Sequence, residues 1–181
     1  MNVRPPAPEE VVAGWDAFPC GSLALLTGGR GAGKTRWCEA FARAGREVGL
    51  AVSGLVSPAV LARGEKTGID LLDVASGQRR RLAERARADL PGTEGLGWRF
   101  DPETLALGNA LLARIATCDL LLVDELGPLE FGRGSGLTAA FALLDASRYR
   151  LAVVVLRPAL VAAARARWPE AAHVWELEGN S

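Results

Sequence analysis

One stretch of the sequence carries residues of the types and spacing that bind phosphate. Positions 28 to 35 fit the pattern G-x-x-x-x-G-K-[ST], with Gly28, Gly29, Arg30, Gly31, Ala32, Gly33, Lys34 and Thr35 in order. The glycines leave the loop bare, so backbone N–H groups can surround phosphate oxygens. We expect Lys34 to reach the β- and γ-phosphates as a catalytic residue, and the Thr35 hydroxyl to bind Mg²⁺. The whole stretch through Arg36 is therefore predicted to bind nucleotide.

The segments on either side favour this phosphate-binding loop (P-loop) over a glycine-rich turn that binds nothing. Residues 23–27 form a short apolar run, which is typical of a buried strand. Residues 36–44 place their apolar side chains on one face of a helix. A helix that begins directly after the loop adds unpaired N–H donors and the positive end of its dipole.

A second constellation follows another apolar run, at residues 120–123. Asp124 and Glu125 come directly after this run, where the carboxyl end of a buried parallel strand is expected. Ligands bind at that edge of open α/β sheets. Asp124 is predicted to hold Mg²⁺, and Glu125 to act as the general base for a water molecule. The alternative is that both carboxylates only begin a surface loop.

Several motifs together resemble the cancer-related nucleoside-triphosphatase family of small P-loop enzymes. They are the P-loop, GLVSP at 54–58, TGIDLLDVASG at 67–77 and, most specifically, VDELGPLEF at 123–131. The likeness spans residues 23–177. Members often carry a Glu-Val-Arg run where this chain has residues 58–63, so Arg63 could be a displaced counterpart. The resemblance implies slow, Mg²⁺-dependent hydrolysis of ATP, GTP or other nucleoside triphosphates to diphosphate and phosphate, with broad base tolerance.

Strands that alternate with helices predict an α/β fold. We expect a three-layer P-loop NTPase domain with a mostly parallel central sheet and an inserted β-hairpin within residues 48–74. Residues 1–20 are predicted to be an N-terminal arm with a short helix, and residues 21–181 a single domain. Further elements are expected as a brief strand at 98–100, helices at 101–117, 137–146 and 157–166, a loop at 90–97, and an edge strand at 174–177.

The order of the strands follows from Glu125 and from one remaining apolar run. A catalytic glutamate after the second motif is typical of P-loop proteins in which an extra strand separates the two motif strands. The unbroken apolar run at 151–156 suits a strand that is buried on both faces. We therefore place it between the predicted strands 23–27 and 120–124. The carboxyl end of this strand would then open beside the γ-phosphate, and Arg157 is the first residue after it. It either stabilises the transition state as an arginine finger in cis or only pairs with a neighbouring carboxylate.

The composition limits the partners. The chain has 181 residues, of which 49% are hydrophobic and 23% charged, and Lys+Arg and Asp+Glu both number 21. This balance gives no reason to expect nucleic acid or an acidic membrane as a partner. No apolar run approaches the roughly 18 residues of a membrane span. A cytoplasmic location is therefore predicted, and the oligomeric state is left open.

Two other functions compete with hydrolysis. A small-molecule phosphotransferase would use the same phosphate loop, and it needs an acceptor pocket and a lid that covers charge. The arginine-rich stretch from Arg79 to Arg87 is the only candidate lid in the sequence, although its charges favour a solvated strand or helix face over a lid. A nucleotide-dependent adapter or switch would bind partners with negligible turnover. Glu125 argues against the adapter, since a switch does not need a general base.

Overall fold

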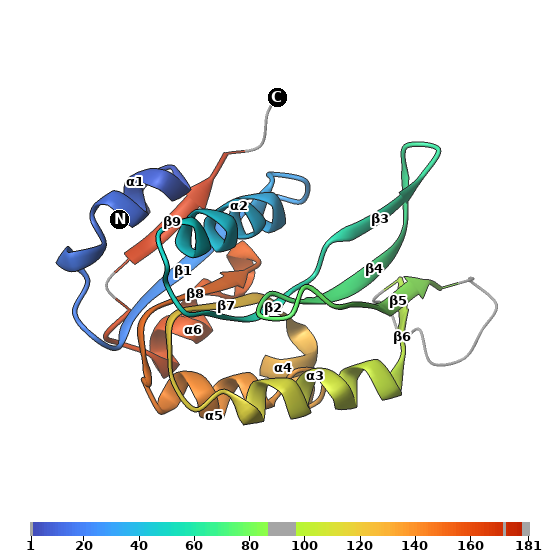
Figure 1. Ribbon diagram of the computed structural model, residues 1–181. Helices are drawn as coiled ribbons and strands as arrows, with labels where there is room; N and C mark the ends of the chain where they lie inside the picture. The colour runs from blue at the N-terminus through green and yellow to red at the C-terminus, as the bar shows by residue number, and fades with distance from the viewer. Residues whose placement is uncertain (1, 87–96, 172, 179–181) are drawn as a thin grey trace.

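A nine-stranded sheet divides the molecule into three layers in the computed structural model, which describes residues 2–86, 97–171 and 173–178 (Figure 1). The strands are β1 (Ser22–Gly28), β2 (Val52–Val56), β3 (Ala59–Ala62), β4 (Glu65–Asp73), β5 (Arg79–Arg85), β6 (Trp98–Phe100), β7 (Cys118–Leu126), β8 (Tyr149–Leu156) and β9 (His173–Leu177). The α-helices are α1 (Pro8–Ala13), α2 (Lys34–Glu47), α3 (Pro102–Arg114), α4 (Pro128–Arg133), α5 (Ala139–Asp145) and α6 (Val161–Arg167). None of the described helices is long and apolar enough to cross a membrane.

The strand order is β6-β5-β4-β2-β7-β8-β1-β9, with β3 paired to β4. Strands β2, β7, β8, β1 and β9 run parallel, whereas β3 to β6 extend the sheet in antiparallel pairs. The predicted α/β class, the parallel centre and the inserted hairpin are confirmed. So is the predicted position of β8 between β1 and β7, which puts Arg157 beside the ends of both motif strands.

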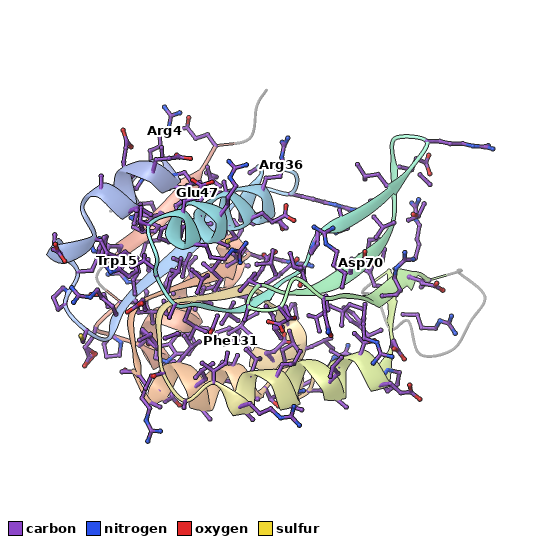
Figure 2. The ribbon with its side chains drawn as sticks, in the orientation of Figure 1. Arg4, Trp15, Arg36, Glu47, Asp70 and Phe131 are labelled. Carbon is purple, nitrogen blue, oxygen red and sulfur yellow. The ribbon has the colours of Figure 1, made fainter. Side chains whose placement is uncertain are left out.

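Alternate side chains of the central strands belong to two separate hydrophobic cores, one on each face of the sheet. On one face, Ala24 and Leu26 of β1 pack with Trp37 and Phe41 of α2. On the other face, Leu25 belongs to the core that α3, α5 and α6 cover. Figure 2 shows Trp15 on the α1 side of the sheet and Phe131 on the opposite side. Because both faces are covered, the central strands read as continuous apolar runs rather than as alternating patterns.

The N-terminal arm lies along the outer strand of the parallel part of the sheet. Val3 donates its N–H to the Val174 carbonyl at 3.0 Å and accepts from the Glu176 N–H at 2.8 Å. The indole of Trp37 on α2 donates to the Pro6 carbonyl at 3.0 Å. These bonds attach the arm to both β9 and α2.

The β3–β4 hairpin turns through two residues, Arg63 and Gly64, with φ angles of 52° and 80°. Two consecutive residues with positive φ match a type I′ turn, whose twist suits the strands on either side. The predicted hairpin therefore exists, and the 48–56 run, as β2, does pair antiparallel with β4, Leu55 with Asp73 and Val56 with Leu72, but the additional strand β3 lies between them in the chain and supplies the turn into β4. Strand β2 begins only at Val52, because Gly49, with a φ of 86°, follows the end of α2.

Other boundaries also differ from the expected ones. Gly127-Pro128, expected only to break the chain, starts the short helix α4, since proline is favoured in the first helical turn. The predicted helix at 157–166 begins as a 3-10 turn at Pro158–Leu160. The arginine-rich stretch forms the strand β5 from Arg79 to Arg85. Its expected continuation to Arg87 and all but the last residue of the predicted 90–97 loop lie outside the described residues.

Gly54 sets the spacing of β2 and β7. Its φ is 119°, and a Cβ built there would lie 1.9 Å from the Leu122 carbonyl oxygen. We predict that Gly54→Ala lowers the free energy of unfolding by about 3 kcal/mol or more, because the side chain forces the two central strands apart. Urea denaturation measures this change.

Gly132→Ala is the matched control. Gly132 lies in α4 with no atom within 4 Å of a built Cβ. Alanine there should leave stability unchanged or raise it by up to about 1 kcal/mol, since alanine favours helix. Equal losses in the two variants would contradict the role given to Gly54.

Candidate active site

The carboxyl ends of β1, β7 and β8 open into one cavity of about 880 Å³. Of the predicted nucleotide-binding residues, seven line this cavity: Gly28, Arg30, Gly31, Gly33, Lys34, Thr35 and Arg36. Gly29 and Ala32 belong to the same loop but do not line it. Asp124, Glu125 and Arg157 line the cavity as well. The structure thus brings together, at the carboxyl ends of three strands, all the residues predicted to be catalytic or to bind metal.

The loop between β1 and α2 has the backbone that a phosphate cradle needs. Gly31 and Gly33 have φ angles of 80° and 91°, and Gly33 is the residue that precedes the first turn of α2. The Lys34 ammonium folds over the loop and donates to the carbonyl oxygens of Gly28 and Gly29, each at 2.8 Å. Burial lowers the pKa of Lys34, although Glu125 and Asp124 partly oppose that shift.

Asp124 is a buried carboxylate, with 2% of its surface exposed. Its Oδ2 accepts from the Ser57 N–H at 3.0 Å, and the Thr35 hydroxyl hydrogen-bonds to its side chain. Burial raises the pKa of Asp124 to about 6, and the bonds from Ser57 and Thr35 limit that rise. Among the described residues, no lysine or arginine forms an ion pair with it.

A hydroxyl and a carboxylate in contact, with no ion-pair partner for the carboxylate among the described residues, fit a hard divalent ion such as Mg²⁺. The described residues contain no cluster of three or more His, Cys, Asp or Glu side chains that could hold a metal. A metal at Thr35 and Asp124 would therefore take its other oxygen ligands from phosphate and water, as Mg²⁺ commonly does.

Glu125 has a strained backbone, with a φ of 66°. The register between β7 and β8 shifts between Val123 and Leu126, so Asp124 and Glu125 sit in a bulge. Bulges re-aim side chains and occur often beside active sites. The Glu125 Oε1 accepts from the Arg157 Nε at 2.9 Å, with the two side chains 37% and 55% exposed. The neighbouring-carboxylate interaction that the sequence offered for Arg157 is therefore present.

Two further residues support the site: the sequence indicated no role for Ser57, and it indicated Glu130 only as a second candidate for the general base. Ser57 donates from its backbone to Asp124, and its hydroxyl bonds the Asp124 carbonyl at 3.3 Å. Glu130 is buried, and it accepts from the N–H groups of Gly127 and Leu137, each at 2.8 Å. Glu130 thus closes the loop that follows Glu125. The signal in the sequence was its place in the VDELGPLEF stretch at 123–131.

We predict that Asp124→Asn stabilises the protein free of metal and nucleotide at pH 7.5. An ordinary Asp has a pKa of about 3.9, so a folded value near 6 favours the protonated form. The stabilisation from that form is complete below about pH 4 and is lost as the pH rises through 6. The variant should therefore gain about 2 kcal/mol at pH 7.5 and nothing near pH 4. Urea denaturation with a chelator measures this, and an equal gain at both pH values would contradict it.

Known proteins resemble this chain in sequence over more than half of its length. A model of the NTPase family matches residues 24–174. The nucleoside-triphosphatase THEP1 of Ignicoccus hospitalis is 32% identical over 105 residues, which cover 58% of each chain. The THEP1 proteins of Methanopyrus kandleri and Thermococcus kodakarensis are 28% and 29% identical over 72% of this chain and 71% and 74% of their own.

Two solved structures share the fold. The solution structure of a human cancer-related nucleoside triphosphatase has a TM-score of 0.63 and 23% identity, and the alignment covers 88% of this chain and 89% of that one. The crystal structure of THEP1 from Aquifex aeolicus has a TM-score of 0.60 and 16% identity, with 86% and 90% covered. The family match spans most of the chain and confirms the predicted nucleoside-triphosphatase class: this chain belongs to the NTPase family.

Proposed function

We propose that the chain hydrolyses nucleoside triphosphates to diphosphate and phosphate, with Mg²⁺ and with broad base tolerance. One observation carries the proposal: Lys34, Asp124, Glu125 and Arg157 converge on the cavity that the phosphate loop opens into. The residues proposed to act on substrate all act on its phosphates. Because every nucleoside triphosphate shares these phosphates, the arrangement supports tolerance of different bases.

The loop and Lys34 bind the triphosphate in this proposal. Backbone N–H groups between Gly28 and Thr35 cradle the phosphates, and the positive end of α2 adds to their stabilisation. The Lys34 ammonium exchanges the carbonyls of Gly28 and Gly29 for the β- and γ-phosphate oxygens. Thr35 and Asp124 would hold Mg²⁺, which when bound neutralises charge that develops on those oxygens.

Glu125 is the proposed general base. Its carboxylate takes the proton of a water molecule as the water oxygen bonds to the γ-phosphorus. The bond from that phosphorus to the bridging oxygen breaks, and the nucleoside diphosphate leaves with the electron pair. The bond from Arg157 fixes one carboxylate oxygen, which supports a positioning role for Arg157 as well as the proposed transition-state contact.

We predict that Glu125→Gln lowers kcat by roughly 100-fold or more, the scale of a lost general base, while nucleotide still binds. Phosphate release measures kcat, and a fluorescent triphosphate analogue measures binding. Glu130→Gln is the matched control, because Glu130 is a cavity-lining glutamate that holds two backbone N–H groups. It should lower stability more than kcat. Normal turnover by Glu125→Gln would rule out Glu125 as the base.

We predict that Arg157→Ala lowers kcat by about tenfold or more, and a double-mutant cycle separates its two proposed roles. If Arg157 only positions Glu125, its removal should cost nothing further in the Glu125→Gln background. If it also contacts the phosphoryl group in the transition state, the double variant should be slower than Glu125→Gln alone. Unchanged kcat in the single variant would contradict both roles.

A further inference from the structure

The cavity extends well beyond the phosphate-binding residues. Its far wall is apolar and partly aromatic, and five side chains from four elements build it: Ile69 of β4, Leu82 of β5, Trp98 and Phe100 of β6, and Leu105 of α3. Small-molecule sites are typically lined in this way, with a few polar groups that fix orientation. A water molecule that attacks a phosphate needs no such wall.

The wall lies on the side from which a nucleophile would approach. Strands β4 to β6 follow β2 and β7 in the sheet, on the opposite side of β1 from β9. The loop cradles the α- and β-phosphates while Lys34 reaches the β- and γ-phosphates, so the γ end of the chain faces Glu125. The nucleoside end of the bound triphosphate points in the opposite direction. An attacking group in line with the leaving oxygen must therefore come from the Glu125 side, through the cavity that Glu125 and the wall residues both line.

Lys66 lines the same cavity and lies beside the aromatic part of the wall. Its ammonium lies 5.0 Å from the centroid of the Trp98 ring, and both residues line the cavity. Within the described parts of the chain, no carboxylate forms an ion pair with it. Burial lowers the pKa of Lys66, and Glu125, Arg30, Asp124 and Arg157 are the charges that act on it. A half-buried cation of this kind suits an anionic group that arrives from outside.

We propose that this wall is a subsite for a planar heteroaromatic alcohol, such as a nucleoside, that accepts the γ-phosphoryl group in place of water. The proposal rests on the triphosphate site described above. The aromatic rings of Trp98 and Phe100 offer faces and edges to a flat ring system. Lys66 then covers charge on the phosphoryl oxygens as they move toward the acceptor.

The transfer step uses the same groups as hydrolysis. The acceptor hydroxyl oxygen bonds to the γ-phosphorus, and its proton passes to the Glu125 carboxylate. The bond from the γ-phosphorus to the bridging oxygen breaks, and the nucleoside diphosphate leaves with the electron pair. The products are a phosphate ester and a diphosphate, so the step needs no other reactant.

The test uses the full chain with Mg²⁺, ATP labelled in its γ-phosphate, and one alcohol at a time. The alcohols are adenosine, guanosine, cytidine, uridine, thymidine and pyridoxine. The expected result is a labelled phosphate ester with at least one of them, formed at the expense of labelled free phosphate. Trp98→Leu and Lys66→Met should each lower the ratio of ester to free phosphate by about tenfold, the scale of one lost stacking or charge contact.

Trp15→Leu is the matched control, because Trp15 packs on the opposite side of the sheet, and the ratio should not change. Far-ultraviolet circular dichroism and thermal unfolding establish that each variant folds. Absence of ester with all six alcohols would overturn the subsite, while phosphate release without alcohol would still support the hydrolase. Loss of both reactions would overturn both proposals.

The other possible occupant is the base of the bound triphosphate itself. In that case Trp98→Leu would raise the KM for ATP and leave the KM for inorganic tripolyphosphate, which has no base, unchanged. That result would overturn the acceptor subsite. If the acceptor subsite is correct, Trp98→Leu changes the two KM values by the same factor.

Discussion

The contact between the Thr35 hydroxyl and the Asp124 carboxylate joins the two halves of the site. Thr35 lies in the first turn of α2, and Asp124 lies near the end of β7, so neither can move without disturbing the other. A buried carboxylate without an ion-pair partner is costly, and proteins tolerate such groups chiefly where a function needs them. Strand β8 lies between β1 and β7 and so separates the two strands that carry these groups.

The residue after Asp124 also carries an energetic cost, in its backbone conformation. Glu125 is not a glycine, yet it has a positive φ, which costs of order 1–3 kcal/mol. The bulge that produces this conformation also turns the side chain of Glu125 toward Arg157 instead of into the sheet. Strain of this kind persists where the surroundings over-determine it, and here β8 on one side and the Glu130-closed loop on the other do so. The bulge thus orients a partly exposed carboxylate at Glu125, and the cost is a less stable end of strand β7.

The central part of the fold could be predicted because its signals are local and strong. The phosphate loop, the apolar run before Asp124 and the run before Arg157 each indicate a parallel strand end, and the strand order followed from them. The antiparallel half was harder, because β3 is exposed and β5 is mostly arginine, so neither shows a buried pattern. The apolar wall was not foreseen either. Trp98 and Leu105 meet Ile69 only through long-range packing, which no spacing in the sequence records.

The N-terminal arm gives β9 a neighbour that it would otherwise lack on its outer side. A strand with unpaired N–H and C=O groups is a template on which another chain can add a strand, and such additions lead to aggregation or domain swapping. Val3 occupies both a donor and an acceptor position of that template. The short arm can therefore serve as a built-in blocker that leaves the β9 edge of one molecule unavailable to the sheet of the next.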